Sequence, residues 1–380
     1  MPGPLDGVRV VELAAIGPAP HAVMMLADLG ADVIRVDRVA AAAGNPGTEI
    51  TSLGMARNRR SIAVDLKREE GLALVRSLLD QADVVVEGFR PGVMERLGLE
   101  PETCLERNPG LVYGRMTGWG QQGPLSHTAG HDINYAAITG ALHGIGPADQ
   151  PPPVPLNLIA DFGGGATYLA FGIVAALLRR ERTGEGQVVD AAMVDGVASL
   201  TSYFHGLIEL GMWSVDREAN LLDGAAPFYC TYETADGGYV AVGAIEPKFH
   251  TTLLETLDLD PAEFPQEDRA GWPAQKRRLA EVFASRTRDE WNELFRESDA
   301  CVAPVLSFSE APHHPHLQDR QTFVERSGRV QPGPAPRFSR TPGQIVSDPP
   351  EFGEHTDEIL RELGVTTEEI ERLRANAVVG

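Results

Sequence analysis

VRVVEL at residues 8–13 and VIRV at residues 33–36 are two short runs rich in β-branched side chains, and each is typical of a strand. The pattern of residues 20–29 between them is helical, and a Gly-Pro turn precedes it while a glycine ends it. A strand, a helix and a second strand in this order predict a βαβ unit, in which the two strands lie parallel.

The same alternation continues along the chain. Further strands are predicted over residues 61–66, 84–87 and 112–116, and helices over residues 68–79 and 92–97. Alternating strands and helices favour a mostly parallel sheet that helices cover. We therefore expect a Rossmann-like α/β domain.

The chain after the proline-rich stretch at residues 147–155 completes this domain. A long helix is predicted over residues 162–182, a strand over 188–190 and another helix over 193–210. The apolar run inside the first of these helices is shorter than the roughly 20 residues that a membrane span needs. It indicates a buried helix, and we expect no association with a membrane.

A second, smaller α+β domain is expected from residue 229 onward. Hairpin-like strands are predicted within residues 229–244 and charged helices within 247–298, whereas residues 303–350 resemble a return linker before a last helix over 356–375. The expected boundaries are 1–210 and 330–380 for the large domain, 225–302 for the small domain, and 211–224 and 303–329 for the linkers.

Composition excludes several classes of function. The formal net charge of −21 disfavours binding to nucleic acid or to an anionic membrane surface, since both need a basic face. Cys104, Cys230 and Cys301 are far apart, which supports neither a disulfide framework nor a thiolate metal site. The N-terminus is acidic where a signal peptide would be basic. We expect a cytoplasmic protein without a metal.

Segments that follow strands deserve inspection, because ligands of an open parallel sheet bind beyond the carboxyl ends of its strands. The first such segment, residues 14–20, lacks the GxGxxG spacing, so a nicotinamide or flavin site is disfavoured. Arginines cluster near other strand ends, and guanidinium groups bind phosphates bidentately. A polyanionic ligand could be bound there, although single surface arginines often only balance nearby carboxylates. These arginines are Arg38, Arg57, Arg59, Arg60 and Arg90.

Three acid or base side chains stand beside helix starts or glycine-rich turns. His131 follows a glycine, Asp161 precedes Phe162 and three glycines, and Glu246 precedes Pro247. Each has a plain structural interpretation as well: a structural histidine, a helix N-cap, and a first-turn carboxylate favoured by the helix dipole. Both glycine-rich segments are expected to open helices and to present free N–H groups.

Longer motifs carry a resemblance to a known family. PLDGVRVVEL at residues 4–13, LGADVIRV at 29–36, EGFRPG at 87–92 and TGWG at 117–120 resemble the class III CoA-transferase (CaiB/BaiF) superfamily, and the likeness runs through nearly the whole chain. GHDINY at 130–135 and VGAIEP at 242–247 resemble its α-methylacyl-CoA racemase branch, because transferases of the superfamily commonly carry Tyr in place of this His.

The resemblance implies a homodimer of two interlocked subunits, with each active site formed between the large domain of one chain and the small domain of the other. It implies an acyl-CoA thioester as substrate and no further cofactor. The implied catalytic residues are His131, Asp161 and Glu246, with Asp132 and Tyr135 nearby; the implied contacts of coenzyme A are Ile16, Arg38, Arg57, Arg60 and Arg90.

Three functions are compatible with these residues. In a racemase, His131 and Asp161 serve opposite faces of the carbon beside the thioester, and Glu246 orients the imidazole. In a CoA-transferase, Asp161 would instead be a nucleophile that forms a mixed anhydride. A protein that only binds coenzyme A would leave all three side chains unused. His131 and Glu246 favour the racemase, because a transferase does not require them.

Overall fold

A computed structural model describes residues 3–39 and 54–380 of the chain. The chain divides into two units. Unit 1 comprises Met1–Thr139, Pro155–Leu200 and Arg320–Gly380, and unit 2 comprises Gly140–Val154 and Thr201–Asp319.

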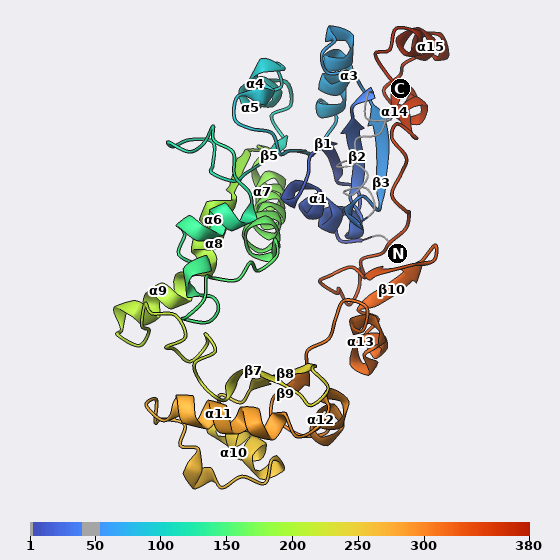
Figure 1. Ribbon diagram of the computed structural model, residues 1–380. Helices are drawn as coiled ribbons and strands as arrows, with labels where there is room; N and C mark the ends of the chain where they lie inside the picture. Colours follow the sequence, from blue (N-terminus) through green and yellow to red (C-terminus); the bar gives the residue numbers. More distant parts are fainter. Residues whose placement is uncertain (1–2, 40–53) are drawn as a thin grey trace. The chain divides into compact units, whose positions relative to one another are not determined.

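Unit 1 is built on a parallel sheet, which has six strands within the described residues (Figure 1). The strand order is β3-β2-β1-β4-β5-β6, and every neighbouring pair is parallel. This confirms the predicted α/β fold. The strands are β1 (Arg9–Leu13), β2 (Asp32–Asp37), β3 (Arg59–Ala63), β4 (Val84–Glu87), β5 (Val112–Thr117) and β6 (Val188–Ala192).

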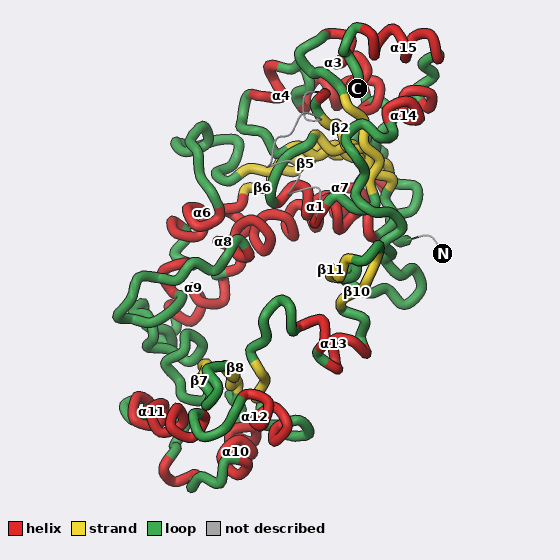
Figure 2. Tube along the Cα trace, turned by 45° about the vertical axis from the view of Figure 1, so that its right-hand side comes forward, coloured by secondary structure: helices red, strands yellow, loops and turns green. Residues whose placement is uncertain are grey.

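Helices cover both faces of this sheet (Figure 2). On one face lie α1 (Pro18–Asp28) and α7 (Thr167–Thr183). The other face packs against α3 (Glu69–Leu79), α4 (Val93–Arg96), α5 (Pro101–Arg107), α14 (Thr356–Glu362) and α15 (Thr367–Ala375). The remaining described elements of unit 1 are α6 (Asp132–Ile138), α8 (Met193–Leu200), η3 (Leu158–Ala166), β10 (Phe323–Arg326) and β11 (Arg329–Pro332).

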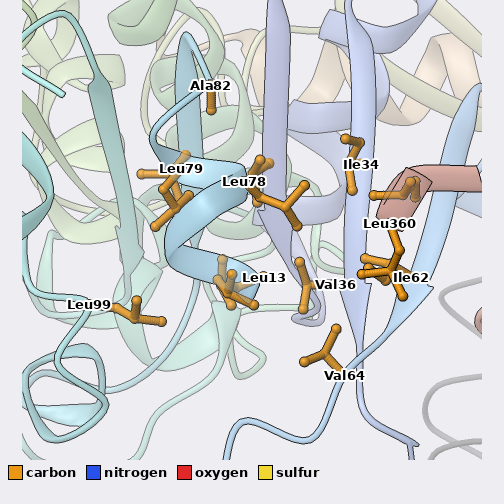
Figure 3. Packing of buried hydrophobic residues seen from close by; sticks show 14 of the residues in the cluster. Leu13, Ile34, Val36, Ile62, Val64, Leu78, Leu79, Ala82, Leu99 and Leu360 are labelled. Atoms are coloured by element: carbon orange, nitrogen blue, oxygen red, sulfur yellow. The ribbon is translucent and has the colours of Figure 1, made fainter. Parts of the chain in front are cut away.

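The core on the α3 face follows from strand alternation. Val11 and Leu13 of β1 point to this face with Ile34 of β2, because alternate residues of a strand share a side. Leu78 of α3 packs among them (Figure 3), and each such leucine stabilises the fold by about 1.5–3 kcal/mol when fully buried. Leu360 of α14 extends the same cluster beside β3, so the C-terminal residues are part of the core.

The long helix predicted over residues 162–182 differs from the prediction in two ways. A wide π-helical turn, η3, precedes α7, and only one face of α7 is buried. Ile173 is fully buried, whereas Phe171 and Leu178 are 73% and 57% exposed. Residues 158–183 are apolar and long enough to span a membrane by composition alone, a test that core helices also pass.

Unit 2 contains an antiparallel sheet in the order β7-β8-β9, which has three strands among the described residues. The predicted hairpin around residues 236–238 is confirmed as β7 (Tyr229–Glu233) and β8 (Tyr239–Gly243), and β9 (Val302–Pro304) pairs with β8. The helices are α9 (Ser202–Glu209), α10 (Pro247–Thr256), α11 (Trp272–Phe283), α12 (Arg288–Phe295) and α13 (Pro315–Asp319), with short turns η2 (Leu142–Gly144), η4 (Pro261–Glu263) and η5 (Ala311–His313).

The segment 303–350 is more than a linker. It contains α13 and a hairpin of β10 (Phe323–Arg326) and β11 (Arg329–Pro332). The hairpin belongs to unit 1 and is held there by Arg57, whose guanidinium donates to the Gln331 side chain at 2.9 Å and to the Pro332 carbonyl at 2.8 Å. The expectation of an unpacked segment is wrong here, since local composition does not reveal this contact with Arg57.

A buried ion pair connects three elements of unit 1. Glu12 of β1 and Arg59 of β3 are each 1% exposed in their side chains, and their charged atoms lie 2.6 Å apart. Arg59 also donates to the Pro20 carbonyl in α1 at 2.6 Å. A buried charge is tolerated only when it is paired, so each residue requires the other.

Replacing Arg59 by Met is expected to lower the free energy of unfolding by about 3–5 kcal/mol, because Glu12 is then buried without its partner. Urea unfolding followed by far-UV circular dichroism measures the change.

Arg107→Met supplies a matched control, since Arg107 pairs with Asp80 at the surface and its side chain is 46% exposed. Loss of an exposed pair is expected to cost about 1 kcal/mol or less. Equal losses in the two variants would contradict a structural requirement for the buried pair.

Candidate active site

A cavity of about 280 Å³ opens at the carboxyl ends of the strands of unit 1. Its wall includes the loops that follow β1, β4 and β5, together with the start of α6 and part of η3. The lining includes the polar side chains of Arg90, Trp119, His131, Tyr135 and Asp161, and Ile16 and Met193 add apolar surface.

The strand order explains why the cavity lies there. The chain runs outward in one direction from β1 to β2 and β3, and in the other direction from β4 to β5 and β6. The loops after β1 and β4 therefore diverge and leave a crevice between them, as at the switch point of other open parallel sheets. Residues 16–18 and 88–91 line this crevice.

His131 immediately precedes α6 and is exposed to the cavity. Its backbone is extended, with φ −134° and ψ 173°, and its N–H donates to Asn134 Oδ1 at 3.0 Å. This contact fixes the backbone of His131 at the helix start while the imidazole stays accessible. The sequence prediction that His131 belongs to a ligand site remains a prediction, but the side chain is placed for it.

Tyr135 lies one helical turn after His131 and is buried. Its hydroxyl donates to the Gly130 carbonyl, and its ring meets Trp119 edge to face at 4.7 Å. Two positions that contact this ring require glycine. A Cβ would lie 2.1 Å from the ring at Gly118 and 2.7 Å from it at Gly130. Tyr135 therefore holds together the two ends of the segment between β5 and α6, and both ends line the cavity.

Asp161 lies within η3, half-buried in the wall of the cavity. Burial of its carboxyl raises the pKa of Asp161 above its ordinary value, while an amide hydrogen bond from Asn157 lowers it in part. The Asn157 side chain donates to Asp161 Oδ2 at 3.0 Å. The sequence reasoning missed Asn157, although its position four residues before Asp161 is the spacing of neighbours on a helix.

Asp132 does not line the cavity, although the sequence placed it near the catalytic residues. It is 6% exposed, and its Oδ2 accepts the backbone N–H groups of Ala160 and Asp161, each at 2.7 Å. The N–H of Asp161 is thus occupied, and Asp161 lies inside a turn instead of at a helix N-cap. At Asp161 itself, the expected free N–H group is not available, because it donates to the Asp132 carboxylate.

The predicted arginines separate into two groups. Arg90 lines the cavity, and Arg38 is exposed just after β2. Arg57 is buried and pairs with Asp28 at 2.6 Å, and Arg60 binds Asp32 at 2.9 Å. Carboxylates distant in sequence already bind both guanidinium groups, and the assignment of Arg57 and Arg60 to the coenzyme A site stays a prediction. Arg59 is likewise used by Glu12.

Glu246 lies in unit 2, at the residue before α10, and is exposed. A larger cavity of about 630 Å³ also lies in this unit, over the sheet. Two of its charged groups, Lys276 and Glu218, bind each other at 2.8 Å, and Asp223 also lines it. The described residues include no group of three His, Cys, Asp or Glu side chains that could hold a metal ion.

The cavity of unit 1 combines two groups that can exchange protons. These are the imidazole of His131 and the carboxyl of Asp161, and burial raises the pKa of that carboxyl above its ordinary value. Tyr135 shares this environment, because burial and the charge of Asp161 raise its pKa. Proton transfer is the chemistry that these side chains support.

The sequence profile of CoA-transferase family III matches residues 5–356. Over 378 residues, the chain is 48% identical to the α-methylacyl-CoA racemase of Mus musculus and 46% identical to that of Homo sapiens, covering 99% of this chain and 97% of each relative. A solved CaiB/BaiF family protein from Brucella suis matches with a TM-score of 0.82 and 28% identity, covering 96% of this chain and all of that one.

Replacing Asn157 by Ala is expected to move the titration midpoint of the Asp161 carboxyl to higher pH. The lost amide N–H stabilises the charged form, so its removal raises the pKa further. Carbon-13 NMR of protein labelled at the Asp carboxyl carbons measures the midpoint.

Asn376→Ala is the control, because Asn376 is exposed at the end of α15 and should leave the midpoint unchanged. A midpoint in Asn157→Ala at or below that of the wild type would contradict this account of Asp161.

Proposed function

Because the chain belongs to CoA-transferase family III, we propose that it acts as a 2-methylacyl-CoA racemase, which interconverts the (2R) and (2S) epimers of its substrate. Its high identity to two α-methylacyl-CoA racemases supports this activity. The observation that carries the proposal is that His131 and Asp161, one base and one acid, open into the same cavity.

In the proposed reaction, a proton leaves C2 of the acyl group and another returns to the opposite face. His131 takes the proton from one face, the electron pair moves toward the thioester oxygen to form an enolate, and Asp161 gives its proton to the other face. The reverse direction exchanges the two roles. The bonds made and broken are two C–H bonds at one carbon, so the reaction needs no further cofactor.

The enolate oxygen requires hydrogen-bond donors. We assign this role to the backbone N–H groups at the start of α6, because the first N–H groups of a helix have no partner within it. Each donor of this kind contributes roughly 3–4 kcal/mol to the stability of a transition state with a developing oxyanion. His131 is the residue just before α6, so the start of this helix positions both the proposed base and the proposed N–H donors.

Arg90, Arg38 and Ile16 are the proposed contacts of the coenzyme A portion. Arg90 and Ile16 line the cavity, and a guanidinium group there can bind a phosphate bidentately in an acidic protein. The assignment of Glu246 rests on the sequence resemblance alone, with orientation of the His131 imidazole as its proposed role.

Replacing His131 or Asp161 by Ala is expected to abolish epimerisation while binding of the CoA ester stays largely intact, because one residue removes the proton from C2 and the other returns a proton to the opposite face. The assay incubates one epimer of a 2-methylacyl-CoA in D₂O and follows the configuration and the deuterium content at C2. Glu246→Gln is expected to weaken turnover without abolishing it.

His127→Ala provides a matched control, since His127 is an exposed histidine four residues before His131. Wild-type turnover by His131→Ala or Asp161→Ala would refute the two-base assignment. In the same assay with an added carboxylic acid, transfer of CoA to that acid with C2 unchanged would identify a transferase in which Asp161 is the nucleophile.

We also propose a homodimer. Phe171, Val174 and Leu178 share one face of α7 and are 73%, 41% and 57% exposed, an apolar surface that a second copy could cover.

Light scattering after gel filtration is expected to give twice the 40.9 kDa mass of one chain, and Phe171→Glu is expected to reduce it because a charge in a buried apolar interface is unfavourable. Lys67→Glu, a charge change at another exposed position, should not alter the mass. A monomeric wild type would contradict the proposal.

A further inference from the structure

The carboxylate of Asp132 is buried in an arrangement that substrate binding does not explain. The residue is 6% exposed and does not belong to the wall of the cavity. Its Oδ2 accepts the N–H groups of Ala160 and Asp161 at 2.7 Å each, whereas its Oδ1 is buried and has no hydrogen-bond partner among the described residues. A buried carboxylate with one unsatisfied oxygen is costly, which argues for a specific role.

Asp132 connects the two proposed acid and base groups directly. It follows His131 in the chain at the first position of α6, and it binds the backbone of Asp161 in η3. These residues are separated by about thirty positions in sequence, so the carboxylate is a short tertiary link between them.

The far side of η3 is held by close packing. A Cβ at Gly164 would lie 2.8 Å from the Val197 side chain, and one at Gly165 would lie 2.9 Å from that of Met193. Glycine at these positions thus lets η3 approach α8 closely. These glycines have no side chain that could also bind η3 to α6. The Asp132 carboxylate supplies that contact.

We propose that Asp132 is a positioning residue whose carboxylate sets the separation of His131 and Asp161 without touching the substrate. The inference rests on the proposed function, since it concerns the geometry of the same two-base site. An ordinary first-turn carboxylate, which favours a helix only through the dipole, would not need burial or bonds to another element.

The charge of Asp132 gives the proposal a second consequence. The charged and polar groups around the Asp161 carboxyl are Asn157, Asp132, His131 and Tyr135. Among these, the negative charge of Asp132 raises the pKa of Asp161. Removing that charge should therefore lower the titration midpoint of Asp161, an effect that a purely structural role would not produce.

The test compares Asp132→Ala and Asp132→Asn with the wild type in kcat, KM and the carbon-13 titration of Asp161. Asp132→Ala removes the acceptor, so kcat is expected to fall about 100-fold while KM changes little, as for other misplacements of about 1 Å. Asp132→Asn keeps an oxygen that can accept both N–H groups, so it should recover part of kcat and shift the Asp161 midpoint to lower pH.

Asp83→Asn is the matched control. Asp83 also accepts a backbone N–H, from Arg9 at 2.7 Å, but it precedes β4 at the opposite end of the sheet from the cavity. This variant should leave kcat and the Asp161 midpoint unchanged. If Asp132→Ala does not fold, Asp132→Asn decides the question.

Wild-type kcat together with an unmoved midpoint in Asp132→Asn would overturn the inference, and so would a loss that appears in KM alone. A wild type that does not racemise refutes the proposed function separately. The titration then still tests the coupling: a lower midpoint in Asp132→Asn supports it, and an unchanged midpoint overturns it.

Discussion

A glutamate in the middle of the large sheet imposes the constraint on which unit 1 depends. Glu12 lies on β1, between β2 and β4 in the sheet, and helices cover both faces of that sheet. Its carboxylate is therefore buried away from water. Only a cation from a neighbouring element can compensate it, and Arg59 of β3 does so. The same guanidinium binds the Pro20 carbonyl, which fixes the start of α1 next to the loop that lines the cavity.

Buried carboxylates also fix the backbone around the candidate active site. Glu87 at the end of β4 is fully buried, pairs with Arg115 at 2.8 Å and accepts the N–H of Phe89 at 2.7 Å. This contact holds the loop that presents Arg90. Asp132 holds the turn that presents Asp161 in the same way. In both cases a carboxylate that does not line the cavity fixes the backbone next to, or at, a residue that does line it. The side chains of the site are thus held by rigid elements of unit 1.

The environment of Asp161 suits the removal and return of a proton at carbon. Racemisation needs one group that is protonated and one that is not, at the same pH, on opposite faces of one carbon. A freely solvated carboxyl would be ionised at neutral pH, but burial raises the pKa of Asp161 and so increases its protonated fraction. His131 is exposed in the same cavity, where its imidazole is accessible to a substrate.

Sequence periodicity alone predicted the parallel α/β sheet and the hairpin of β7 and β8, because these depend on neighbours close in the chain, whereas the roles of His131 and Asp161 were implied by the family resemblance. Tertiary structure decided which charged groups are available. Arg57 looks like Arg90 in sequence, yet Asp28 occupies it while Arg90 faces the cavity. Burial and pairing depend on residues tens or hundreds of positions apart, and a local pattern carries no information about such contacts.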